Sequence, residues 1–214
     1  MLGETHCPLC DSTDSAAYAR DRRREYLQCQ RCDLVYVPPA YYLAREAELA
    51  EYQLHENTVH DAGYRRFLSR LAQPLVERLP AGARGLDFGC GPGPALAQML
   101  REQGFEVALY DPFFAPDERP FEQVFDFICA TEVVEHLHRP GWELQRLWSL
   151  LAQGGWLGVM TKLVLGQEAF ARWHYKNDPT HVCFFSRTTW QWWAQANNAE
   201  LVFVGSDVML LGKG

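Results

Sequence analysis

Four of the seven cysteines form two pairs near the N-terminus, Cys7-x2-Cys10 and Cys29-x2-Cys32. Each pair places two thiolates on one turn, and two such turns can close a tetrahedral site around zinc. Four cysteine ligands leave no open position for water, so the pattern predicts a structural zinc rather than a catalytic one. Zinc would also supply folding free energy that so small a unit cannot obtain from its core. We therefore expect a zinc module over residues 1–40.

A glycine-rich segment is the second chemical signal, Asp87-Phe88-Gly89-Cys90-Gly91-Pro92-Gly93-Pro94. Between a strand and a helix, such a turn lets a ligand lie against bare backbone. A dinucleotide is one alternative, but its fingerprint needs a small residue where this chain has Pro94. Asp87 would repel a pyrophosphate, whereas it would attract the α-amino group of a methionine moiety. The loop therefore favours a ligand with a positive amino group.

A second acid, Asp111, ends the next predicted strand, 18 residues beyond Gly93. An acid at this position suits the two hydroxyls of a ribose. Two acids around a glycine loop are more specific than the loop alone. The combination favours S-adenosylmethionine as the ligand.

These residues resemble motifs of the class I S-adenosylmethionine-dependent methyltransferases, with Asp87-x-Gly89-x-Gly91-x-Gly93 as the first motif and Asp111 as the second. Residues 125–137 are similar to the fourth strand and the segment after it, and residues 150–157 to the turn into the fifth strand. The resemblance covers residues 50–211. It implies a cofactor site formed by Asp87, Gly89, Cys90, Gly91, Gly93, Asp111, Pro112 and Thr131. The cysteine module resembles the zinc ribbon that precedes some small-molecule methyltransferase domains.

The stretch after Asp111 departs from that family. It is short and contains Pro112, Pro116 and Pro120, so the usual third strand is expected to be missing or vestigial. Phe113 and Phe114 are candidates for adenine contacts, and core packing is the alternative for both.

Methyl transfer is an in-line displacement that depends on alignment, and a base is needed only where the nucleophile carries a proton. Two polar clusters follow predicted strands, at the edge where open parallel sheets bind ligands. The first is Glu135-His136-Leu137-His138. His136 is its candidate catalytic residue, and capping of the following helix is the alternative.

The second cluster spans residues 173–182, and its Asp178-x-Thr180-His181 run resembles a segment of some zinc-ribbon methyltransferases. We predict His181 as general base, oriented by Asp178, with Tyr175 as a hydrogen-bonding partner. The alternative is a turn made by Asp178 and Thr180 that His181 only pins.

The elements that would position these residues alternate between strands and helices. Strands are expected at 84–88, 106–110, 125–130 and 156–161, helices at 94–103, 141–152 and 187–197, and an antiparallel pair at 201–204 and 208–211. This order predicts an α/β fold with a Rossmann-like, mostly parallel sheet and an antiparallel C-terminal hairpin. The chain divides into the zinc module at 1–40, a helical lid or linker at 41–83 and the methyltransferase domain at 84–214.

The lid segment contains one expected helix at 41–52 and an amphipathic stretch at 59–79 that Pro74 should kink or split. Four of its residues could fold over the cofactor, with plain packing as the alternative: Tyr52, His55, Asn57 and Tyr64.

Composition restricts the partners. The net charge is −7, and the only dense basic run is Arg22-Arg23-Arg24, so nucleic acid is not the expected partner. We expect that run to be a solvated turn between two strands. No apolar run is long enough to span a membrane and no secretory signal is visible, which favours the cytoplasm. Trp190, Trp192 and Trp193 cannot all face inward, which favours a homodimer or an aromatic acceptor.

The sequence thus predicts transfer of a methyl group from S-adenosylmethionine to a small-molecule acceptor. An alternative within the same enzyme class is a methyltransferase for RNA or a translation protein, with the zinc module docking the macromolecule. An alternative from another class is a non-catalytic scaffold that binds S-adenosylmethionine.

Overall fold

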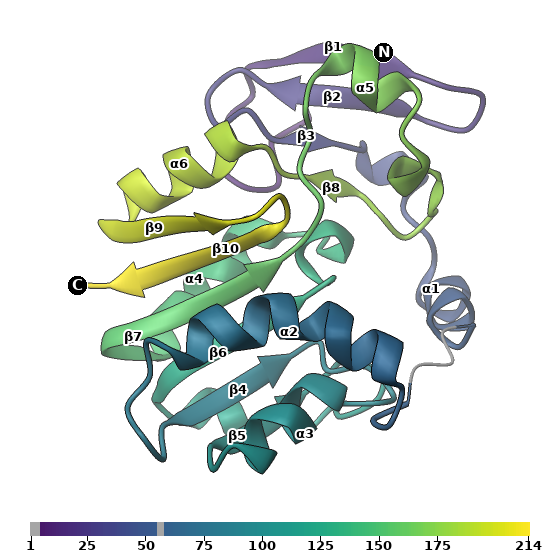
Figure 1. The fold of residues 1–214 in the computed structure, drawn as a ribbon. Helices are drawn as coiled ribbons and strands as arrows, with labels where there is room; N and C mark the ends of the chain where they lie inside the picture. The colour runs from purple at the N-terminus through teal and green to yellow at the C-terminus, as the bar shows by residue number, and fades with distance from the viewer. Residues whose placement is uncertain (1–4, 55–57) are drawn as a thin grey trace.

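The computed structural model describes residues 5–54 and 58–214, and its largest element is a six-stranded sheet in the order β5-β4-β6-β7-β10-β9 (Figure 1). The strands are β4 (Arg84–Phe88), β5 (Glu106–Tyr110), β6 (Phe125–Thr131), β7 (Leu151–Met160), β9 (Ala199–Val204) and β10 (Val208–Lys213). Strands β5, β4, β6 and β7 run parallel, whereas β10 is antiparallel to β7 and β9. The expected α/β sheet with an antiparallel C-terminal hairpin is confirmed.

The segment between β5 and β6 contains no strand of this sheet, as its prolines predicted; residues 111–124 all lie in the described part of the chain. It forms one isolated bridge between Asp111 and Ala115 and a short 3-10 helix, η2 (Arg119–Glu122). The chain therefore turns back over the end of β5.

Helices cover both faces of the sheet (Figure 1). One face carries α2 (Ala62–Val76) and α3 (Ala95–Glu102), and the other carries α4 (Pro140–Leu150) and α6 (Arg187–Ala196). Apolar residues at three- and four-residue spacing produce these buried faces. The expected split at Pro74 does not occur, and α2 runs on to Val76. Because Pro74 lies near the end of the helix, its missing N–H disturbs only the last turn.

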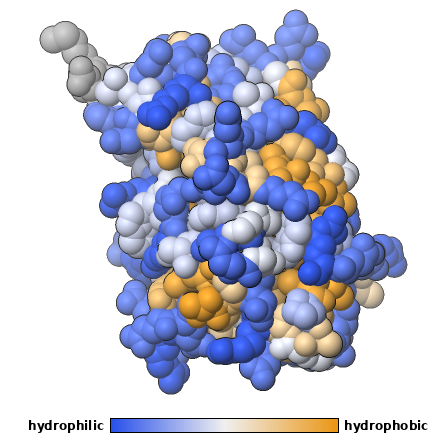
Figure 2. Space-filling model, turned by 90° about the vertical axis from the view of Figure 1, so that its left-hand side faces the viewer, coloured by the Kyte–Doolittle hydropathy of each residue, from blue (hydrophilic) through white to orange (hydrophobic). Residues whose placement is uncertain are grey.

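The tryptophans of α6 divide between core and surface. Trp190 and Trp193 are buried, and Trp192 is half-buried below the guanidinium of Arg31, 5.8 Å from the ring centre. On the face drawn in Figure 2, apolar surface forms separate patches among hydrophilic residues. A homodimer therefore stays a prediction.

A second, four-stranded sheet lies above the first (Figure 1). Its order is β1 (Ser15–Arg20), β2 (Glu25–Cys29), β3 (Val35–Tyr36) and β8 (Cys183–Phe184). Strand β8 comes from the C-terminal half of the chain and pairs with β3 directly after the second polar cluster. The N-terminal four-cysteine module is thus joined through its sheet to the segment that carries His181, and one apolar core connects it to the face covered by α4 and α6.

The strand β7 begins earlier than expected. It starts at Leu151 and continues through Gly154 and Gly155, which the sequence places in a turn. A Cβ on Gly155 would lie 2.9 Å from the carbonyl oxygens of Ala152 and Asp126, so only glycine fits this irregular start of the strand.

The remaining elements are short: η1 (Pro39–Tyr41), α1 (Arg45–Tyr52), η3 (Val134–His136), α5 (Gln167–Ala171) and η4 (His174–Asn177). Within the described ranges, no helix has the length and apolar character needed to cross a membrane. Two of the predicted lid residues, His55 and Asn57, lie outside the described residues.

Candidate active site

One cavity of about 490 Å³ opens at the carboxyl ends of β4, β5 and β6. This is the edge at which open parallel sheets bind ligands, and the volume lies in the usual range for small-molecule sites. Helices α1 and α2 close one side through Tyr52 and Tyr64, both predicted as lid residues. Asp178 and His181 line the same cavity, and His136 lies between the rings of Tyr52 and His181 at 5.3 and 4.6 Å. The cavity therefore unites the glycine loop with the second polar cluster.

The glycine loop lines the cavity through Gly89, Cys90 and Gly91. Gly89 and Gly91 have φ values of +73° and +64°, which favour glycine. A Cβ on Gly89 would also lie 2.4 Å from a methyl carbon of Val133. Apart from Gly91 and its two neighbours in the chain, no described residue has an atom within 4 Å of the position that a Cβ on Gly91 would take, so its backbone is open to a ligand.

Asp111 holds the loop in place. Its Oδ2 accepts a hydrogen bond of 3.0 Å from the amide of Gly91, and its Oδ1 accepts from the amides of Phe113 and Phe114 at 2.9 and 3.0 Å. The carboxylate lines the cavity together with Pro112 and both phenylalanines. Phe113 and Phe114 thus face the cavity instead of the core. Thr131, the last predicted cofactor residue on β6, is in the wall as well.

Asp87 lies outside the cavity wall, against the start of α3. Its Oδ2 accepts a hydrogen bond of 3.3 Å from the amide of Ala97 in α3, and burial raises its pKa to about 7. Among the described residues, neither Asp87 nor Gly93 lines the cavity. The geometry gives Asp87 a supporting position beneath the glycine loop, and the predicted contact with an amino group stays a prediction.

The imidazole of His181 is oriented by a different group from the one predicted. Its Nδ1 lies 2.7 Å from the carbonyl oxygen of Tyr175, so Nδ1 donates and Nε2 keeps its lone pair. Asp178 Oδ2 is 3.7 Å from Nε2, beyond hydrogen-bond distance, and Oδ1 accepts instead from the amide and hydroxyl of Thr180. Burial lowers the pKa of His181 to about 4. The ring is therefore neutral at pH 7.

Tyr175, predicted as a hydrogen-bonding partner of His181, bonds to it through the carbonyl oxygen, and its hydroxyl contacts other groups. This hydroxyl donates to Glu135 Oε1 and lies 3.2 Å from both Glu132 Oε2 and the Thr161 hydroxyl. Burial raises the pKa of Glu132 to about 7, and burial with the nearby charge of Glu132 raises that of Glu135 to about 8. The carboxyl groups of Glu132 and Glu135 thus both lie within hydrogen-bond distance of the Tyr175 hydroxyl.

The sequence reasoning did not select these acids as site residues. Glu132 lines the cavity and has a left-handed backbone, with φ of +52°, a conformation that costs free energy in a non-glycine residue. The available signal was two acids three residues apart, directly after a strand. His136 lines the cavity as predicted, whereas His138 stacks on Tyr42 at 4.2 Å.

Arg24 was also missed, because the basic run was expected to be solvated. Its side chain is buried, and its guanidinium donates to four backbone carbonyl oxygens of the second polar cluster: Lys176, Asp178, Pro179 and His181. The turn between β1 and β2 is thereby hydrogen-bonded to the segment that carries His181.

Two other residues of the same turn, Asp21 and Arg23, also contact this segment. Asp21 Oδ2 accepts from Lys176 Nζ at 2.8 Å, and Arg23 donates to the carbonyl oxygen of Asn177 at 3.0 Å. Four consecutive positions of this segment, 176–179, and His181 are therefore held by one turn of the N-terminal module.

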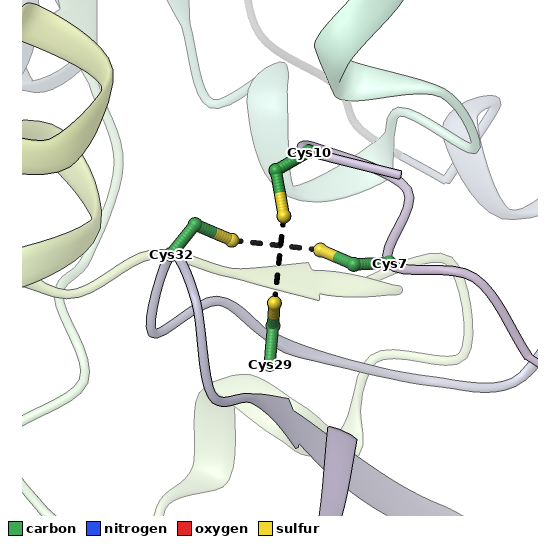
Figure 3. A group of neighbouring side chains, drawn as sticks. All are labelled: Cys7, Cys10, Cys29 and Cys32. Atoms are coloured by element: carbon green, nitrogen blue, oxygen red, sulfur yellow. Dashed lines mark hydrogen bonds between the residues drawn. The ribbon is translucent and has the colours of Figure 1, made fainter. Parts of the chain in front are cut away.

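The four cysteines of the two knuckles converge in space (Figure 3). Their sulfur atoms all lie within 4.8 Å of one another and point toward one centre. The shortest separations are 3.5 Å, for Cys7 to Cys32 and for Cys10 to Cys29. Sulfurs at about 2.3 Å from a tetrahedral zinc are about 3.8 Å apart, whereas a disulfide needs about 2.05 Å. The arrangement fits a four-thiolate zinc site.

Comparison with known proteins agrees with this geometry. A family model described as a methyltransferase domain matches residues 60–204. No curated protein matches the chain.

Several solved structures share the fold. The 1,6-didemethyltoxoflavin-N1-methyltransferase of Burkholderia thailandensis, with bound 1,6-didemethyltoxoflavin and S-adenosylhomocysteine, is 18% identical, covering 92% of this chain and 98% of its own, with a TM-score of 0.56. A SAM-dependent methyltransferase from Archaeoglobus fulgidus is 15% identical, covering 70% and 94%, with a TM-score of 0.52. A chain from the complex of the Haloferax volcanii Trm112 methyltransferase activator with a methyltransferase is 10% identical, covering 79% and 98%, with a TM-score of 0.50.

The family model covers more than half of the chain, and the sheet order and glycine loop agree with it. The chain therefore belongs to the methyltransferase domain family, and its fold is shared with solved S-adenosylmethionine-dependent methyltransferases.

Proposed function

We propose that this enzyme transfers the methyl group of S-adenosylmethionine to a small-molecule acceptor inside the cavity. The observation that carries the proposal is that one cavity is lined both by the glycine loop with Asp111 and by the second polar cluster. In the proposal, Gly89, Gly91 and Asp111 are the cofactor end, and Asp178 and His181 are the acceptor end. A sulfonium cofactor laid on the glycine loop would direct its methyl carbon toward the second end.

The cofactor supplies an activated methyl group, and the protein residues bind, orient and deprotonate. We assign Asp111 to the ribose, because its Oδ2 retains one lone pair beyond the hydrogen bond from the Gly91 amide and can accept from a ribose hydroxyl, whereas its Oδ1 is taken by the amides of Phe113 and Phe114. Phe113 and Phe114 offer apolar surface to the adenine. At the other end, His181 Nε2 would accept the proton that the acceptor loses, with Asp178 beside it.

The acceptor is proposed to be small because aromatic rings wall the cavity. Tyr52, Tyr64, Phe67 and Phe113 contribute apolar surface of the kind that holds a ring or a sugar. A structural neighbour acts on a small heteroaromatic molecule, as its name states. The RNA alternative relies on a basic surface at Arg22–Arg24, and the burial of Arg24 counts against it.

We further propose that the four cysteines bind one structural zinc. The donor set is soft, closed and largely buried, which suits zinc and leaves no position for substrate. The role proposed for the zinc module is to brace the segment that carries His181.

The cofactor assignment predicts that Asp111→Ala weakens binding of S-adenosylhomocysteine by at least about 30-fold, roughly 2 kcal/mol, because both the ribose contacts and the anchor of the Gly91 amide are lost. Titration calorimetry measures the effect. Asp117→Ala is the matched control, since this exposed acid pairs with Arg119 in the same segment and should bind like wild type. Equal affinities for all three proteins would refute the assignment.

The function itself is tested by incubation with S-adenosylmethionine and a panel of phenols, catechols, sugars and amines. Mass spectrometry should find S-adenosylhomocysteine and an acceptor that is heavier by one methyl group. Methylation of an added RNA or protein, and of no small molecule, would contradict the proposal. Tight cofactor binding with turnover of neither class would favour the non-catalytic scaffold.

A further inference from the structure

We propose that Glu135, His136 and His181 form a second metal site, which binds a divalent transition-metal cation at the acceptor end of the cavity. This inference rests on the proposed function and changes one part of it, because a cation on His181 Nε2 leaves Asp178 to take the proton in place of His181. One ligand atom from each of these three residues lies within 4.8 Å of the others. Two histidines and one carboxylate are a donor set that binds Mn²⁺, Fe²⁺ or Zn²⁺ and leaves further coordination positions open.

The carboxylate of Glu135 supplies the second, independent observation. Glu135 is completely buried, and its Oε2 has no hydrogen-bond partner among the described residues. A buried carboxylate oxygen without a partner is costly. A cation bound by Oε2 and the two imidazoles would remove that cost.

The surrounding hydrogen bonds already orient the ligands as metal sites require. Tyr175 holds two of them: its carbonyl oxygen accepts from His181 Nδ1, and its hydroxyl donates to Glu135 Oε1. These contacts leave His181 Nε2 and Glu135 Oε2 for a cation. A ligating histidine usually donates its other N–H to a carbonyl or carboxylate in this way.

The site is also open to the cavity, and two further acids lie near it. His136 and His181 line the cavity, so the open coordination positions face the acceptor. Asp178 Oδ2 is 3.7 Å from His181 Nε2, and Glu132 shares the Tyr175 hydroxyl with Glu135. Both acids would attract a cation to this end of the cavity.

The inference names the acceptor class as a molecule that attacks through a hydroxyl group. A cation that binds this oxygen would lower the pKa of the hydroxyl. The proton then passes to Asp178, since Nε2 of His181 is occupied. The oxygen lone pair forms the new bond to the methyl carbon, while the carbon–sulfur bond breaks and its electron pair stays on sulfur, giving S-adenosylhomocysteine.

The test is a titration of the full-length, zinc-loaded protein with Mn²⁺, followed by the electron paramagnetic resonance signal of the free ion. Mn²⁺ prefers oxygen and nitrogen donors and leaves thiolate-bound zinc in place. Wild type should bind one Mn²⁺ in this site. Glu135→Gln should weaken binding at least about tenfold, and His136→Gln, as a second variant, should do the same. Glu200→Gln, on the exposed side of β9, is the matched control.

Circular dichroism checks that each variant is folded, and calorimetry with S-adenosylhomocysteine checks that the cofactor site is intact. Wild type that binds no Mn²⁺, or two folded variants with unchanged Mn²⁺ affinity, would overturn the metal site. Wild type that binds Mn²⁺ but not S-adenosylhomocysteine would instead overturn the proposed function. Methylation restricted to amines would overturn the acceptor class.

Discussion

Replacing Arg24 by methionine should lower the rate of methyl transfer at least about 100-fold while changing S-adenosylhomocysteine affinity only about threefold or less. Methionine fills similar space but removes the donor of the Pro179 and His181 carbonyl oxygens. It leaves those of Lys176 and Asp178 with only the longer bonds from the Tyr26 hydroxyl and the His181 amide, at 3.4 and 3.3 Å. Each buried group left without its partner costs about 1–3 kcal/mol. The segment should therefore move, and His181 with it. The cofactor end, formed by Gly89, Gly91 and Asp111, is not in contact with this guanidinium.

The measurement has two parts. The rate is taken with the acceptor found in the panel, and amide hydrogen exchange is followed in residues 176–182. Faster exchange in this segment, with zinc still bound, distinguishes loss of positioning from loss of the module. Arg22→Met is the matched control, because Arg22 is exposed on the same turn and should behave as wild type. Arg24→Lys should rescue little, since one ammonium group cannot reach four carbonyl oxygens in the way that a planar guanidinium does.

The parts of this molecule that were predictable are those whose signals are local. A strand, a glycine turn and a helix occupy adjacent positions, so residues 84–103 define their own geometry. The prolines at 112, 116 and 120 forbid a regular strand for the same local reason. Two knuckles of fixed spacing bring four thiols together, whatever the rest of the chain does.

The groups that were missed depend on contacts between distant parts of the chain. Arg24 follows two other arginines in a turn, a pattern typical of solvated charge, and its partners are more than 150 residues away. Long-range contacts, among them the pairing of β3 with β8, bring them together. No spacing rule in the sequence encodes that register.

The orientation of side chains within the site was the other limit. Asp178 precedes His181 by three residues, so a direct hydrogen bond was a reasonable expectation. In the structure, the amide and the hydroxyl of Thr180 both donate to Asp178 Oδ1. The imidazole of His181 donates to the carbonyl oxygen of Tyr175 instead of to Asp178. Competition among neighbouring donors decided the outcome, and residue types alone do not rank such competitors.

Loss of the zinc should have the largest effect of all, because it removes the support of both the module and the His181 segment. A four-thiolate zinc site contributes on the order of 10 kcal/mol to folding at neutral pH, whereas a whole domain is stable by about 5–15 kcal/mol. Cys29→Ser should therefore unfold the N-terminal sheet. That sheet includes β8, so the order of the segment at 176–184 should be lost with it.

Metal analysis of Cys29→Ser should find one zinc fewer per chain than in wild type, with a lower melting temperature and methyl transfer at background level. The knuckle also packs on α4, where the amide of Gly141 donates to the carbonyl oxygen of Pro8 at 3.1 Å, and the damage should reach the sheet on the face that α4 and α6 cover, whereas α2 and α3 cover the other face. S-adenosylhomocysteine affinity should consequently survive better than catalysis. Cys129→Ser, a buried cysteine of β6 far from the knuckles in sequence, should keep its zinc. If Cys29→Ser kept full activity, the zinc module would have no part in positioning His181. The hydrogen bonds of Arg24 would then have no effect on the reaction.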